Sequence, residues 1–264
     1  MEKKKIIMEN RELKIAETVK DIIKSVRERG DSALKYYTEK FDNLNLKEFE
    51  AGKKEISQAY KSVSRETIDA LKFAKENIEL FARKQMEQFK DFQMEENGII
   101  LGQKVIAIEK VGAYVPGGNY PLPSTALMCI IPAKVAGVKE VIVCSPKIKP
   151  ETIVAADMAG ADSIFKIGGA QAVAAMAYGT KTIPKVDKIV GPGNVYVTEA
   201  KKQVYGDCGI DFLAGSSEIM IIADKDANPE FVAADILAQI FERNHVIIDD
   251  GDNAVIDRPA GPHQ

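Results

Sequence analysis

The sequence predicts an α/β fold, in which helices cover both faces of a parallel sheet and a helical segment precedes it. Three observations support this prediction. Apolar residues recur at helical spacing in the first hundred residues, short β-branched runs alternate with small-residue helices after Val111, and glycine-containing loops follow several of these runs. Strands that alternate with helices are typical of βαβ units, whose strands run parallel.

The first hundred residues have the pattern of helices. The first predicted helix places apolar residues at spacings of three and four from Ile15 to Val26 and ends before Gly30, a common residue after a helix. A second helix runs toward Phe41, and a third, long helix starts near Ser64. The apolar stripe predicted for the third helix consists of Ile68, Leu71, Ile78, Phe81, Met86 and Phe89. We find no candidate functional residue in this helical lead-in.

The remaining elements follow from the change of period near Ile99. Strands are predicted over residues 99–101, 105–108, 140–144, 163–167, 188–190 and 219–222. Helices are predicted over residues 124–136, 150–159, 170–179, 194–205 and 228–242. Residues 245–252 have the pattern of a further strand that ends in an Asp-Gly turn.

Composition excludes several classes of protein. The 264 residues include 36 Lys and Arg against 39 Asp and Glu, a net charge of −3, so no basic excess is available for binding nucleic acid. No apolar run approaches the roughly 18 residues of a membrane span, and the start lacks the apolar core of a signal peptide. The cysteines Cys129, Cys144 and Cys208 form no CxxC pattern. We therefore expect a cytoplasmic protein that binds neither nucleic acid nor membranes.

Four glycine-containing loops predict a binding crevice. They cover residues 116–118, 168–171, 191–194 and 214–218, and each is followed by a predicted helix or strand. A turn at a sheet edge explains any single loop, whereas four together favour a shared crevice at the carboxyl ends of parallel strands. Neither GxGxxG nor GxxxxGK[ST] occurs. Helix N-termini at these loops suit an anionic ligand such as a dinucleotide pyrophosphate.

At these loops the sequence resembles the histidinol dehydrogenase family. The resemblance rests on VRERGDSAL (26–34), VGAYVPGG (111–118) with Ser124-Thr125, GGAQA (168–172) and VDKIVGPGN (186–194). The motifs occur in the family's order and at compatible spacings. The resemblance covers about residues 15–239.

The resemblance implies an enzyme of histidine biosynthesis that uses NAD and zinc and oxidises L-histidinol to L-histidine through the aldehyde. It also implies a homodimer and a fold of incomplete Rossmann-like parallel sheets. By analogy, residues 1–112 form a helical lead-in and the first part of domain one. Residues 113–218 form an inserted NAD-binding domain, residues 219–242 return to domain one, and residues 243–264 are a divergent tail.

Five residues match functional positions of the family. Tyr114, Gln171 and Asn194 match residues that contact NAD, Ser217 matches a residue that contacts the substrate, and Gln239 matches one that touches both the substrate and zinc. The residues alone leave other readings open. Tyr114 suits a core edge, Gln171 an exposed helix start, Asn194 a helix cap and Ser217 a turn.

The match ends after Gln239. The family places a zinc-binding histidine one helical turn later, where this chain has Glu242, and it supplies its catalytic Glu-His pair from a longer C-terminal region. The only histidines of the chain are His245 and His263. The resemblance therefore identifies no catalytic residue, leaves zinc binding open and implies that the chain is inactive because it is truncated. The alternatives are an NAD-binding or dimerisation remnant without catalysis and a paralogue that oxidises another small alcohol.

Overall fold

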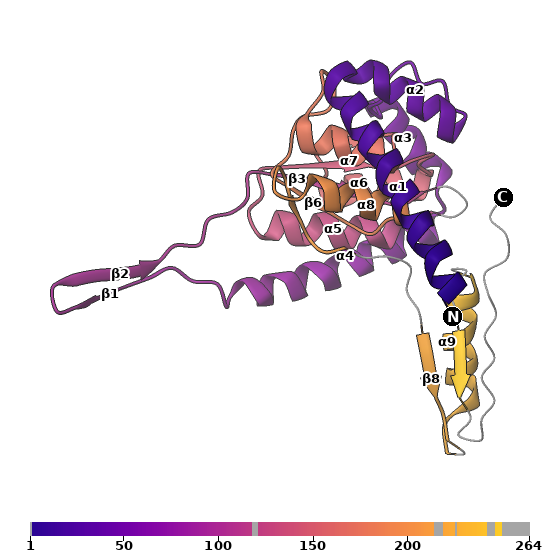
Figure 1. Cartoon of the computed structure of the whole chain (residues 1–264). Helices are drawn as coiled ribbons and strands as arrows, with labels where there is room; N and C mark the ends of the chain where they lie inside the picture. Colours follow the sequence, from indigo (N-terminus) through magenta and orange to yellow (C-terminus); the bar gives the residue numbers. More distant parts are fainter. Residues whose placement is uncertain (1, 118–120, 214–218, 225, 242–245, 250–264) are drawn as a thin grey trace. The chain divides into compact units, whose positions relative to one another are not determined.

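The structure, a computed structural model, describes residues 2–117, 121–213, 219–224, 226–241 and 246–249. The chain divides into two compact units, Met1–Leu213 and Ala214–Gln264. The first unit contains a central sheet with helices on both faces, and the second contains a strand–helix–strand segment (Figure 1).

The central sheet has five strands that all run parallel. They are β3 (Lys110–Tyr114), β4 (Glu140–Cys144), β5 (Ser163–Phe165), β6 (Lys188–Val190) and β7 (Gly209–Ile210). Their order across the sheet is β5-β4-β3-β6-β7, so β3, the first of these five strands in the chain, lies in the middle. This sheet confirms the predicted α/β fold, and the strands predicted over residues 140–144 and 188–190 have the bounds of β4 and β6.

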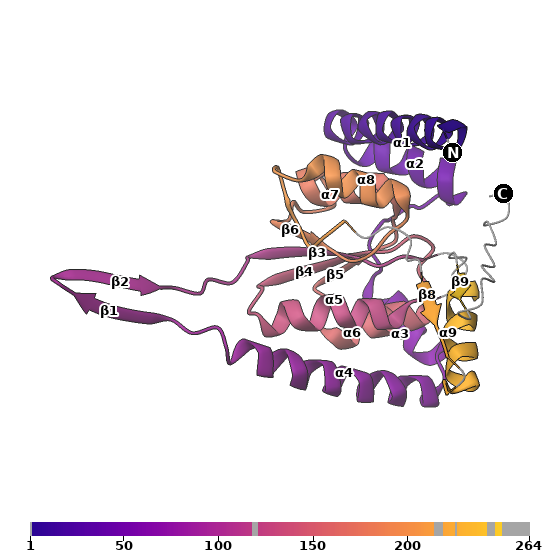
Figure 2. The same cartoon turned by 60° about the horizontal axis from the view of Figure 1, so that its bottom comes forward.

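Helices cover both faces of the sheet (Figure 2). One face carries α5 (Pro123–Val135) and α6 (Pro150–Ala159), and the other carries α7 (Gly169–Tyr178) and α8 (Val195–Val204). Successive residues of β4 alternate between the two apolar clusters that result. Val141 and Val143 belong to the cluster around α5 and α6, whereas Ile142 and Cys144 belong to the cluster around α7 and α8. A strand buried on both faces has a continuous apolar sequence, as β4 does.

The N-terminal helices form additional layers outside these helices. α1 (Glu2–Arg29) and α2 (Asp31–Asp42) lie on the side of α7, and α3 (Lys53–Ser62) and α4 (Arg65–Met86) lie on the side of α5 and α6. The predicted stripe of α1 is buried at Val19 and Val26. Ser64 caps α4, since its hydroxyl accepts a hydrogen bond from the Thr67 backbone N–H at 3.1 Å. The helical lead-in is therefore part of the same compact unit as the sheet.

Two features of this lead-in differ from the sequence prediction. The apolar spacing of residues 53–62 did not predict α3. In α4, Leu71 is buried and Ile78 is half-buried, but Phe81 is 67% exposed, and Phe89 lies beyond the end of the helix. At about 100° per residue, Ile78 lies only about 20° from Leu71 around the helix axis, whereas Phe81 lies about 80° away. The stripe that packs on α5 is thus narrower than the one predicted.

A β-hairpin follows α4. β1 (Phe92–Glu96) and β2 (Ile99–Gln103) are antiparallel, and Asn97 and Gly98 form the turn with φ values of 53° and 79°. Positive φ at both positions is typical of a type I′ turn. The strand predicted over residues 99–101 is thus part of β2. The strand predicted over 105–108 is wrong, because this segment is irregular and pairs with no strand in the described part of the chain.

The second unit contains β8 (Ile219–Ile222), α9 (Pro229–Phe241) and β9 (Val246–Asp249). The two strands pair in parallel, with Ile219 opposite Val246. This arrangement confirms the strand predicted over 219–222 and the helix predicted near 228–242. The predicted Asp-Gly turn lies outside the described residues.

The domain scheme inferred from the family resemblance stays a prediction. Its first boundary, between residues 112 and 113, falls within β3, while the boundary between the two compact units follows Leu213. Among the described helices, none has the length and apolar character needed to cross a membrane.

The sheet core predicts how stability depends on α5. We expect Leu127→Ala to lower the free energy of unfolding by about 2–5 kcal/mol, because this fully buried side chain packs α5 on the sheet. Leu80→Ala makes the same chemical change at a position that is 62% exposed, and we expect less than about 0.5 kcal/mol. Urea unfolding of both variants measures the difference, and equal losses would contradict this packing.

Candidate functional site

The carboxyl ends of β3 and β6 mark the point where the chain changes direction across the sheet. β3 connects through α5 to β4 on one side, and β6 connects through α8 to β7 on the other side. Because α5 and α8 lie on opposite faces of the sheet (Figure 2), the loops that follow β3 and β6 diverge. Open parallel sheets bind their ligands in the crevice at such a point.

Glycines let the backbones of these loops approach closely. A Cβ atom at Gly117 would lie 2.1 Å from the carbonyl oxygen of Pro146, and one at Gly191 would lie 2.1 Å from the carbonyl oxygen of Tyr114. Gly191 also has a φ of 110°, which side chains disfavour. The loop glycines found in the sequence therefore bring the ends of neighbouring strands together around the crevice.

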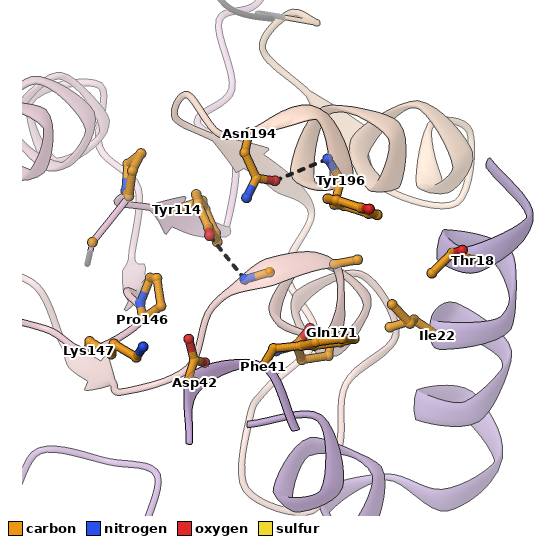
Figure 3. A pocket seen from close by; sticks show the side chains of 14 residues that line it. Thr18, Ile22, Phe41, Asp42, Tyr114, Pro146, Lys147, Gln171, Asn194 and Tyr196 are labelled. Carbon is orange, nitrogen blue, oxygen red and sulfur yellow. Dashed lines mark hydrogen bonds between the residues drawn. The ribbon is translucent and has the colours of Figure 1, made fainter. Parts of the chain in front are cut away.

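A cavity of about 530 Å³ opens at this crevice (Figure 3). Tyr114, Gln171 and Asn194 all line it, although they come from the end of β3, the first turn of α7 and the start of α8. The volume lies within the range of small-molecule sites. The structure thus brings together the three residues that the resemblance assigned to one ligand, and their role in binding it stays a prediction.

Tyr114 lies beneath the cavity, with 3% of its surface exposed. Its hydroxyl accepts a hydrogen bond from the backbone N–H of Gly169 at 3.0 Å (Figure 3). Burial raises the pKa of this hydroxyl well above its usual value, and the Gly169 hydrogen bond opposes that shift only in part. Tyr114 is therefore neutral at physiological pH and joins the end of β3 to the start of α7.

Gln171 lies in the first turn of α7 and is only 1% exposed. The alternative of an exposed helix-start residue is therefore wrong. Its side-chain oxygen is buried and has no hydrogen-bond partner among the described residues. A buried polar atom without a partner costs roughly 1–3 kcal/mol, and most such atoms are satisfied by water or a ligand.

Asn194 caps α8. Its side-chain oxygen accepts hydrogen bonds from the backbone N–H groups of Tyr196 at 3.0 Å and Val197 at 3.1 Å. The capping role considered from the sequence is thus confirmed. The cap uses the amide oxygen, and Figure 3 shows the amide nitrogen on the side of Tyr114. A ligand in the cavity would therefore meet a donor group at this position.

Sequence reasoning missed the part of the cavity wall that the helical lead-in supplies. Thr18 and Ile22 line the cavity from α1, and Phe41 and Asp42 line it from the end of α2. These residues belong to no recognisable sequence motif. Their helices reach the crevice by packing on α7. Lys147 also lines the cavity, three positions after the end of β4, where the topology could have indicated it.

Comparison with known proteins identifies the family. The family model described as histidinol dehydrogenase matches residues 7–246. This chain belongs to the histidinol dehydrogenase family.

Relatives of the chain cover its length but extend further. The histidinol dehydrogenase of Methanocaldococcus jannaschii is 56% identical over 245 residues, which are 90% of this chain and 57% of that protein. The corresponding protein of Clostridium acetobutylicum is 52% identical over 85% of this chain and 53% of its own length. The crystal structure of histidinol dehydrogenase from Elizabethkingia anophelis superposes with a TM-score of 0.82 at 40% identity, over 89% of this chain and 57% of that one. The chain thus spans little more than half the length of these relatives.

Two further residues matched to the family lie outside the described site. Ser217 is not among the described residues, and Gln239 belongs to α9 in the second unit, where its side chain is not described. Glu242 and both histidines are also outside the described part. Within the described residues, no group of three or more His, Cys, Asp and Glu side chains could hold a metal. The described residues therefore do not make up a zinc site, and we assign no step to zinc.

A buried ion pair holds the loop after β6. The carboxylate of Asp211 accepts a hydrogen bond from the N–H of Gly191 at 2.8 Å, and the ammonium group of Lys201 donates to the carbonyl oxygen of Gly191 at 2.9 Å. Lys201 and Asp211 also form an ion pair with each other. The Lys201 side chain is only 3% exposed. Both polar groups of the Gly191 backbone are thus fixed by one charge pair.

This arrangement predicts different roles for adjacent lysines. We expect Lys201→Met to lower the free energy of unfolding by about 3 kcal/mol, because it leaves the Asp211 carboxylate and the Gly191 carbonyl without their partner. Lys202→Met makes the same change at a side chain that is 66% exposed and pairs with Glu199 at 3.7 Å, so we expect less than about 0.5 kcal/mol. Denaturant unfolding compares the two, and a neutral Lys201→Met would contradict the role assigned to the pair.

Proposed function

We propose that the cavity at the ends of β3 and β6 binds NAD, and that the chain supplies the NAD-binding part of a histidinol dehydrogenase. The activity proposed for the complete enzyme is the oxidation of L-histidinol to L-histidine through the aldehyde, in histidine biosynthesis. One observation carries the proposal. Tyr114, Gln171 and Asn194 are far apart in the sequence, and all three line a single cavity at the point where the sheet changes direction.

The residues of the cavity fit a dinucleotide. The unpartnered oxygen of Gln171 can accept a hydrogen bond from a ribose hydroxyl or a carboxamide group. Gly117 allows its loop to approach the Pro146 carbonyl, where a Cβ atom would lie 2.1 Å from the oxygen, and this close contact shapes the cavity wall. Phe41 and Tyr196 provide partly exposed aromatic rings for the flat parts of the ligand.

The electrostatics of the loops also favour an anionic ligand. α7 and α8 both begin at the crevice, so their N-terminal N–H groups and the positive ends of their dipoles lie near the cavity. When bound, NAD supplies the hydride acceptor for oxidation of an alcohol. The chain's own residues bind and orient it, and Tyr114 stays protonated as a hydrogen-bonding group.

The other assignments made by resemblance belong to the same proposal. Ser217 and Gln239 would contact the substrate, and Gln239 would also contact zinc. No described residue is assigned as a general base. The homodimer and the cytoplasmic location also stay predictions.

Gln171 allows a test that separates binding from folding. We expect Gln171→Met to raise the Kd for NAD at least tenfold, about 1.4 kcal/mol, because it removes the amide group at nearly constant volume. The free energy of unfolding should stay equal or rise, because the variant no longer buries an unpartnered oxygen. Calorimetric titration with NAD and urea unfolding of the full chain measure the two effects.

Gln203→Met is the matched control. Gln203 donates hydrogen bonds to the Ala16 carbonyl at 2.9 Å and to the Glu199 carboxylate at 2.8 Å, and it does not line the cavity. We expect this variant to lose about 1 kcal/mol of stability and to bind NAD like the wild type. Failure of the wild-type chain to bind NAD, or unchanged binding by Gln171→Met, would refute the proposal.

A further inference from the structure

The end of β4 corresponds to the position that contacts the adenosine ribose in doubly wound dinucleotide-binding folds. An acidic residue there binds the ribose 2′-hydroxyl of NAD, whereas a basic residue accommodates the 2′-phosphate of NADP. In this chain the segment after β4 is Ser145-Pro146-Lys147, and Lys147 lines the cavity. This position alone would therefore indicate a site that accepts a phosphorylated ribose.

A carboxylate from another element faces the same end of the cavity. Asp42 is the last residue of α2, and Figure 3 shows its carboxylate beside Lys147 and directed toward the cavity. The positive charge of Lys147 lowers the pKa of Asp42, but burial has the larger effect and raises it. The carboxylate of Asp42 forms no hydrogen bond or ion pair with any described residue. A half-buried carboxylate thus has its acceptor sites available to a ligand.

The order of the strands places this pair at one end of a bound dinucleotide. β4, β3 and β6 are neighbours, so Lys147, Tyr114 and Asn194 follow one another along the edge of the sheet. A dinucleotide that lies across these strand ends has its adenosine half near β4 and its other half near β6. Asp42 then faces the adenosine ribose. This placement rests on the proposed NAD site.

We infer that Asp42 accepts hydrogen bonds from the adenosine ribose hydroxyls and makes the site select NAD over NADP. A carboxylate can accept from both hydroxyls of the ribose, and such charge-assisted bonds are strong. A 2′-phosphate would instead place a second negative charge beside the carboxylate in a partly buried site, which disfavours NADP. Lys147 compensates the carboxylate charge while the site is empty or holds NAD. The acidic group expected after β4 is thus supplied by the helical lead-in.

The test compares both dinucleotides by calorimetric titration of the full chain. We expect the wild type to bind NAD at least tenfold more tightly than NADP. In Asp42→Asn we expect the ratio of the two affinities to fall at least tenfold, because NAD loses an acceptor and NADP gains Lys147 without the opposing charge. Asp42→Glu keeps the negative charge and should still reject NADP, even if it binds NAD less well. The double variant Asp42→Asn, Lys147→Met should lose the gain in NADP affinity.

Asp69→Asn is the matched control, since this exposed residue of α4 lies outside the cavity and should leave both affinities unchanged. An unchanged ratio in Asp42→Asn, with NAD still bound by the wild type, would overturn the role of Asp42 alone. Binding of neither dinucleotide by the wild type would overturn the proposed NAD site and this inference with it.

Discussion

The close contact between the backbones of Gly191 and Tyr114 is the constraint on which the site depends. It joins the ends of β3 and β6, the two strands at which the sheet changes direction, and it excludes any side chain at residue 191. Lys201 and Asp211 form hydrogen bonds with both polar groups of the Gly191 backbone and thereby restrain the loop. Asn194 follows in the same loop and starts α8. The position of α8 at the crevice is therefore set by a buried charge pair behind the loop.

A second connection runs from Tyr114 to α7. Its hydroxyl accepts from the Gly169 N–H, so the central strand and the start of α7 are joined beneath the cavity. α1 and α2 pack on α7 in turn, which brings Phe41 and Asp42 to the cavity wall. The helical lead-in therefore contributes to the site because of its packing, although none of its residues has the pattern of a functional motif.

The sequence predicted β4, β5 and β6 and the helices that cover the sheet, but it gave no bounds for β3 and β7 and did not predict the wall of the site. β4 is a run of apolar residues between helices of small residues, and such patterns identify buried parallel strands from local sequence alone. The contribution of Asp42 depends on the packing of α2, which is a tertiary effect that periodicity does not contain. The strand prediction for residues 105–108 was wrong for a similar reason. A β-branched run forms a strand only where a partner strand lies beside it.

The two amide side chains of the site also have roles that the sequence alone does not distinguish, and the difference between them is one of hydrogen-bond energy. Asn194 and Gln171 both stand at helix starts, and from sequence both could be structural. Asn194 satisfies its oxygen within the chain, so its presence is explained by the cap alone. Gln171 buries an oxygen without a partner, a cost that an apolar residue of the same size would avoid. Residues that lower stability and make no compensating interaction within the fold are typical of functional sites. Of the three residues matched to NAD, Gln171 is therefore the one whose burial the fold alone does not explain.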